Sequence, residues 1–96
     1  MFEQLTSQLV ARYRPVKILL FGSQANGTAT DLSDVDVCVV VDTDNKRRLL
    51  ADMYYVIDIE KPVDILLYTP AEWEACLADQ LSFAYKINRE GVVLYG

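Results

Sequence analysis

Two aspartates at alternate positions, Asp34 and Asp36, are the residues of this sequence best suited to chemistry. They open an apolar, β-branched segment, and in a strand their side chains lie on one face, about 6.6 Å apart. Neighbouring carboxylates repel each other and raise one pKa unless a cation compensates the charge. Mg²⁺ binds few carboxylates and completes its shell with phosphate oxygens. The pair therefore predicts a metal site for a phosphate-bearing substrate.

A third acid, Asp64, interrupts the apolar run of residues 63–68. Alternation places its side chain on the same face as Leu66 and Tyr68. If this strand neighbours the one that holds Asp36, a cross-strand spacing of about 5 Å brings Asp64 against the first pair. Three carboxylates in that arrangement are able to hold two metal ions about 3.5 to 4 Å apart. The alternative is an edge-strand aspartate that faces water.

Asp42 and Asp44 have the same spacing as the first pair, so an Asp-x-Asp pattern alone is weak support for a site. This second pair is predicted to lie at an exposed strand exit and to cap the following helix. Lys46, Arg47 and Arg48 then fall in the first helical turn, where cations oppose the helix dipole. Two explanations stay open: pairing with the two preceding aspartates, or contact with a phosphate or an acidic partner.

Gly22 and Ser23 close an apolar segment upstream of Asp34. Glycine lets the backbone approach a ligand closely, and the amides and hydroxyl that follow are able to point at an anion. Alone, the dipeptide is no more than a turn. The Gly-Lys-Ser/Thr sequence of a P-loop does not occur, so that nucleotide-binding motif is excluded.

Composition removes several classes of function. The sequence has no His, which excludes Ser-His-Asp and Cys-His triads and HExxH zinc sites, and leaves carboxylates as the acid-base groups. Its net charge of −5 disfavours direct binding to a polynucleotide or an anionic membrane. Cys38 and Cys76 lie in apolar segments and are predicted to be core residues. No apolar run approaches the ~18 residues of a membrane span and no signal-peptide pattern occurs, so a cytoplasmic location is expected.

The pattern of apolar residues predicts one domain, residues 1–96, of the α/β or α+β class. Helices are predicted at residues 2–13 and 45–57, and from Pro70 to Asn88 with a break left open near residues 79–80. Strands are predicted at residues 16–21, 35–41 and 63–68, with a short edge strand at 92–95 and a loop at 22–33 that has room for one helical turn. The first two strands are expected to pair antiparallel, and the third parallel to one of them, giving a small mixed sheet flanked by helices. Five aromatic residues are assigned to the core: Tyr54, Tyr55, Trp73, Phe83 and Tyr85.

The motifs resemble those of a known superfamily. Gly22-Ser23, ten intervening residues and Asp34-Val35-Asp36 are similar to the GS-x10-DxD signature of the DNA polymerase beta-type nucleotidyltransferases. The string from residue 22 to 40, GSQANGTATDLSDVDVCVV, resembles their minimal nucleotidyltransferase (MNT) domains. This resemblance implies the polymerase beta-type nucleotidyltransferase fold.

The resemblance also implies roles for the motif residues. Gly22 and Ser23 would hold the triphosphate of ATP, and Asp34 and Asp36 would bind two Mg²⁺ ions. Asp64 would ligate the catalytic metal and help deprotonate an acceptor hydroxyl. Nucleotidyl transfer agrees with this chemistry, because it needs in-line positioning and neutralised charge more than covalent catalysis.

Minimal domains of this kind commonly serve as antitoxins beside HEPN-domain toxins. The resemblance therefore implies a HEPN toxin as partner and AMP transfer to one of its tyrosines. Two other functions stay open at this stage. One is a non-catalytic antitoxin that neutralises its partner by occlusion, and the other is nucleotidyl transfer to a small molecule.

Overall fold

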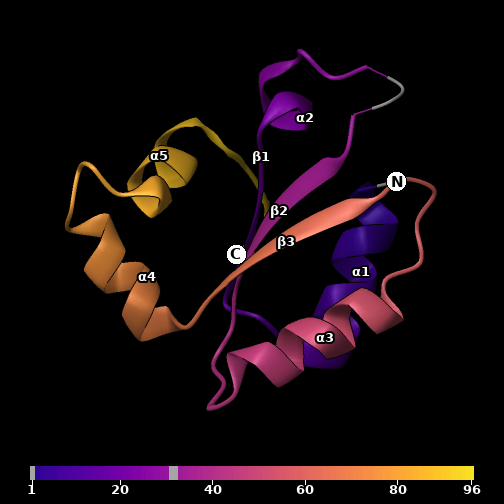
Figure 1. Cartoon of the computed structure of the whole chain (residues 1–96), viewed down its shortest axis with the longest axis horizontal. Helices are drawn as coiled ribbons and strands as arrows, with labels where there is room; N and C mark the ends of the chain where they lie inside the picture. Colours follow the sequence, from indigo (N-terminus) through magenta and orange to yellow (C-terminus); the bar gives the residue numbers. More distant parts are fainter. Residues whose placement is uncertain (1, 31–32) are drawn as a thin grey trace.

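The computed structural model describes residues 2–30 and 33–96 (Figure 1). In chain order its elements are α1 (Phe2–Tyr13), β1 (Lys17–Phe21), α2 (Ser23–Asn26), β2 (Val35–Val40), α3 (Lys46–Val56), β3 (Val63–Tyr68), α4 (Pro70–Leu77), α5 (Phe83–Glu90) and β4 (Val92–Tyr95). The four described strands form a mixed sheet in the order β3-β2-β1-β4. Strand β1 runs antiparallel to β2 and β4, and β3 runs parallel to β2 after the α3 crossover. The predicted mixed sheet is confirmed.

Most element boundaries agree with the sequence pattern. Helix α1 and strands β3 and β4 have the predicted bounds, and the loop at 22–33 contains the single turn α2. Residues 31 and 32 of that loop lie outside the described residues. The helix predicted from Pro70 is divided into α4 and α5, and the break between Leu77 and Phe83 includes the predicted position near residues 79–80.

Side-chain caps explain where α4 and α5 begin. At the start of α4 the Thr69 hydroxyl accepts a hydrogen bond from the Glu72 amide at 3.2 Å, and the Glu72 carboxylate accepts one from the Thr69 amide at 2.9 Å. This reciprocal box satisfies two amides that the helix leaves free. At the start of α5 the Ser82 hydroxyl accepts from the Tyr85 amide at 3.1 Å and donates to the Cys76 carbonyl. Ser82 therefore starts a new helix and ties it to the end of α4.

Both faces of the sheet are covered, α1 and α3 lying on one side and α4 and α5 on the other (Figure 1). Each face of the sheet has its own hydrophobic core, and alternating residues of β2 belong to one or the other. Val37 and Val39 pack toward α1 and α3, and Cys38 and Val40 pack toward α4 and α5. Burial on both faces explains the nearly continuous apolar run of β2. Its one charged member, Asp36, is half-buried.

The cysteines do not form a disulfide. Cys38 is fully buried, and burial raises its pKa to about 12, so the thiol stays protonated and unreactive. Cys76 is half-buried against the same core. The prediction that both are core residues is confirmed. Within the described chain no helix is long and apolar enough to cross a membrane.

The start of α3 corrects one prediction and, for Lys46, removes one of the two open explanations. Asp42 and Asp44 are exposed, as expected, but neither caps the helix. Asn45 does, because its side-chain oxygen accepts a hydrogen bond from the Arg48 amide at 3.1 Å. Lys46 does not pair with the preceding aspartates either: its ammonium lies 3.0 Å from the Glu72 carboxylate of α4. Lys46 and Glu72 are close because α3 and α4 begin just after the neighbouring ends of the parallel strands β2 and β3.

The aromatic residues also depart from expectation. Trp73 is buried, whereas Tyr54, Tyr55 and Phe83 are exposed by 47%, 90% and 51%. Tyr54 has a structural role at the edge of the sheet, where its hydroxyl accepts a hydrogen bond from the Ile65 amide of β3 at 2.8 Å. This contact satisfies a backbone donor that an edge strand otherwise presents to solvent or to another chain.

Helices α1 and α3 are bridged by Asp52. Its carboxylate accepts hydrogen bonds from the Arg12 guanidinium at 3.2 Å and from the Tyr13 hydroxyl at 2.6 Å. The bond from Arg12, followed by the bond from Tyr13, holds the pKa of Asp52 below its ordinary value. Burial, and then the bond to Asp52, raises the pKa of Tyr13.

The depressed pKa gives a testable pH dependence. Asp52→Asn is expected to lower Tm by a few degrees or less, because the bridge is exposed. The stabilisation by ionised Asp52 is complete above the ordinary aspartate pKa of about 3.9 and is lost as pH falls through the lower pKa of the folded state. The difference in Tm between wild type and variant should therefore be constant near neutral pH and shrink in acid. A difference that grows as pH falls would contradict this assignment.

Candidate active site

The register of the sheet brings Asp36 and Asp64 together. They are directly opposed across the parallel pair β2 and β3, on the face of the sheet that bears α4 and α5. Asp34 lies two residues before Asp36, where the Val35 amide extends the pairing by a 2.9 Å hydrogen bond to the Pro62 carbonyl. Strands 2 and 3 are thus neighbours, as the predicted cluster required.

Electrostatics links the three acids. Burial raises the pKa of Asp36, and the negative charges of Asp64 and Asp34 raise it further. Asp34 and Asp64 are themselves exposed. The half-buried carboxylate between them is therefore the one on which a bound cation would act most strongly.

Gly22 lies against the same carboxylate. Phe21, at the end of β1, pairs with Asp36, so Gly22 directly follows the strand position opposite this acid. Its backbone has φ 72° and ψ −152°, and a Cβ at this position would overlap with the Asp36 carboxylate. Only glycine adopts this conformation readily and leaves that space free. The glycine-serine part and the Asp-x-Asp part of the motif are thus in direct contact at Gly22 and Asp36.

Ser23 begins the single turn α2, which lies where β1 ends and β2 begins (Figure 1). The turn is held by its own hydrogen bonds: the Gly22 carbonyl accepts from the Ala25 amide at 3.1 Å, and the Asn26 side-chain oxygen accepts from the Thr28 hydroxyl at 2.6 Å. Among the described residues the Ser23 hydroxyl has no hydrogen-bond partner. It is therefore available to a ligand.

A cavity of about 380 Å³ opens beside Gly22 and Asp36. Gly22, Ala25, Asn26 and Asp36 line one side, and Phe83, Lys86, Ile87 and Glu90 of α5 line the other. Its volume is within the range of small-molecule sites. Asp34 and Asp64 do not line it. The cavity therefore touches the three-acid cluster at Asp36 alone.

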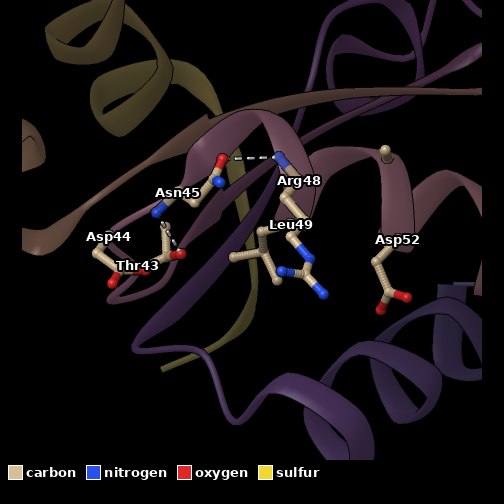
Figure 2. Close-up of a pocket in the computed structure, with 7 residues that line it drawn as sticks. Thr43, Asp44, Asn45, Arg48, Leu49 and Asp52 are labelled. Atoms are coloured by element: carbon tan, nitrogen blue, oxygen red, sulfur yellow. Dashed lines mark hydrogen bonds between the residues drawn. The ribbon is translucent and has the colours of Figure 1, made fainter.

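A wider hollow of about 720 Å³ lies at the other end of β2, beside the start of α3 (Figure 2). Asp44, Asn45, Arg48 and Asp52 line it, and the Asn45 side chain is engaged in capping Arg48. Arg48 extends between Asn45 and Asp52 in this view. None of the candidate site residues reaches this hollow, so it is separate from the cavity at Asp36.

The donor set suits a hard cation, because carboxylate oxygens are the ligands that Mg²⁺ prefers. Within residues 2–30 and 33–96, however, no three Asp, Glu or Cys side chains are arranged to hold one ion. The register places Asp36 beside Asp64, but it does not turn all three carboxylates toward a common point.

Comparison with known proteins identifies the family of this chain. Residues 3–95 match the sequence profile described as "Nucleotidyltransferase domain". The chain belongs to this family. No curated protein matches the sequence.

A solved structure gives the same fold. The crystal structure of a "putative nucleotidyltransferase" from Sulfolobus solfataricus superposes with a TM-score of 0.59 and 19% identity, covering 97% of this chain and 78% of that one. The nucleotidyltransferase-type fold implied by the sequence motifs is thus confirmed. General nucleotidyl transfer is the activity of the family.

Sequence reasoning missed the contribution of α5. Phe83, Lys86 and Glu90 line the cavity opposite Gly22, although they lie about 60 residues from it in sequence. Their i, i+3, i+7 spacing places them on one helical face, which was the available signal. That signal could not show which face would meet the motif.

Proposed function

We propose that this domain transfers a nucleoside monophosphate from ATP to a hydroxyl acceptor. The observation that carries the proposal is the contact of Gly22 with Asp36, which is itself paired with Asp64 across β2 and β3. It joins the glycine-serine turn to a set of carboxylates at the edge of a cavity. The match of residues 3–95 to the nucleotidyltransferase domain supports it.

In this mechanism Gly22 and Ser23 contact the triphosphate, and Asp34, Asp36 and Asp64 are the residues that would hold Mg²⁺, as one or two ions. Metal held there would supply neutralisation of the phosphate charge and a lower pKa for the acceptor hydroxyl. The acceptor oxygen attacks the α-phosphorus, a new O–P bond forms, and the bond to the departing pyrophosphate breaks. Asp64 receives the hydroxyl proton.

The acceptor we propose is a tyrosine of a HEPN-domain toxin, so that the domain acts as an antitoxin by AMP transfer. The support is the resemblance of residues 22–40 to minimal nucleotidyltransferase domains. A net charge of −5 also favours a basic protein partner through complementary fields.

Intact-mass analysis of such a partner tests this proposal. After incubation with ATP and Mg²⁺, the partner is expected to gain AMP with wild-type protein and to gain no mass with Asp64→Asn. Asp58→Asn is the matched control, because it removes an exposed aspartate just upstream of β3 and should leave the transfer intact. If wild type and Asp64→Asn both inhibit the partner equally and neither adds mass, occlusion is the mechanism and the transfer proposal is wrong.

A further inference from the structure

Helix α5 forms the wall of the cavity that faces the glycine-serine turn, and its orientation is fixed by packing. Ala84 and Ile87 are 0% and 2% exposed, and both pack against the core that contains Leu19 and Cys38 of the sheet. Ser82 fixes the start of the helix. Because these contacts set the rotation of α5, its outward-facing residues border the cavity beside Gly22 and Asp36.

Charge in this cavity is uneven. Asp36 and Glu90 line it, and Asp34 and Asp64 lie nearby, so an incoming triphosphate meets several negative groups. Among the described lining residues Lys86 carries the only positive charge. Ions held by the three aspartates would act on one side of the phosphates. The side formed by α5 needs a cation of its own.

Lys86 is free to supply that charge. The ion pairs of the described residues are Arg12 with Asp52 and Lys46 with Glu72, and neither involves Lys86. Glu90 lies one turn further along the helix but is not in ion-pair contact with it. The Lys86 ammonium is exposed on a long, flexible side chain and has three donors to offer.

We propose that Lys86 binds the phosphates of the nucleotide from the α5 side of the cavity. Phe83 and Phe21, whose rings meet edge to face at 5.5 Å, form the apolar surface next to it. Lys86 thus compensates the phosphate charge that faces away from the aspartates. This inference rests on the proposed function and adds a residue that lies outside the glycine-serine and aspartate motifs.

The test compares Lys86→Met with Arg89→Met in the intact protein. Each variant removes one positive charge from the same helix, but Arg89 borders the neighbouring groove and not this cavity. The probes are an ATP analogue with a methylene group between its α- and β-phosphates, inorganic tripolyphosphate, and adenosine, each with Mg²⁺. Calorimetry gives Kd and thermal melting monitors the fold.

Lys86→Met is expected to weaken binding of the analogue and of tripolyphosphate by about 10- to 100-fold, the range of a charged hydrogen bond. Adenosine binding and Tm should change little, Lys86→Arg should restore most of the affinity, and Arg89→Met should bind like wild type. Equal affinities of Lys86→Met and Arg89→Met for both phosphate probes would overturn the inference while leaving the proposed function standing. Wild type that binds neither phosphate probe would overturn both.

Discussion

Replacing Asp34 and Asp36 together by asparagine is expected to abolish Mg²⁺-dependent nucleotide binding and to lower nucleotidyl transfer by about 1,000-fold or more. The reason is that both substitutions remove carboxylate oxygens that we assign to the metal, and a two-metal site neutralises the attacking and leaving groups together. Calorimetry with the methylene-bridged ATP analogue, with Mg²⁺ and with a chelator, measures the binding. Release of pyrophosphate measures the reaction.

The second aspartate pair supplies a matched control. Asp42→Asn with Asp44→Asn repeats the spacing and the charge change at the exposed end of β2, far from Gly22. This control should bind and react like wild type. Nucleotide affinity that chelator does not change, or that the Asp34 and Asp36 substitutions leave intact, would contradict the metal site.

The same double substitution has a second consequence, for stability. Burial and the charges of Asp64 and Asp34 raise the pKa of Asp36. Ionised Asp36 is therefore less favourable in the folded state than in the unfolded state, and it lowers the free energy of unfolding. Neutral asparagine removes this repulsion. Tm in the absence of metal should therefore be unchanged or higher, which separates loss of activity from loss of fold.

Gly22→Ala is the second substitution with a large expected effect. The new Cβ would overlap with the Asp36 carboxylate at a backbone conformation that only glycine adopts readily. We expect a loss of stability of about 1 to 3 kcal/mol and a loss of nucleotide affinity of at least about 100-fold. Ser23→Ala should cost only about 2- to 13-fold in affinity, because it removes one hydroxyl contact.

Gly27→Ala is the control for Gly22→Ala. Gly27 also has a positive φ, 81°, but nothing lies within 4 Å of an added Cβ. Its substitution should therefore cost stability through backbone strain and spare nucleotide binding. Urea unfolding and calorimetry measure the two effects.

A double-mutant cycle tests the contact itself. In the background of Asp36→Ala, the carboxylate that blocks the new methyl group is gone, so Gly22→Ala should cost less stability than in wild type. Equal costs in the two backgrounds would show that the two residues are not coupled.

Most helices and strands, and the chemical type of the site, follow from local residue patterns alone. The β-branched run at residues 35–40 required a strand buried on both faces, and the Thr-Pro-x-Glu signal at Thr69 required a helix start. Asp36 and Asp64 were recognisable because a charge inside an apolar strand is costly without compensation. These signals are local, since they depend on residues a few positions apart.

Which distant residues meet depends on the packing of the whole chain. The pairing of Asp36 with Asp64 depends on how α3 packs as it carries the chain from β2 to β3, and the overlap of Gly22 with Asp36 depends on the antiparallel register of β1 and β2. The pairing of Lys46 with Glu72 likewise depends on the parallel register of β2 and β3, because α3 and α4 both begin just beyond the ends of these strands.

The position of helix α5 depends most clearly on tertiary packing. Nothing near Lys86 in the sequence indicates a ligand. Its position opposite Gly22 follows from the burial of Ala84 and Ile87 in a core that includes Leu19, Cys38 and Val40, more than 40 residues away. Helix spacing shows which residues share a face, but burial in the assembled core decides where that face points. The motif thus specifies one wall of the cavity, and only the packed fold supplies the other.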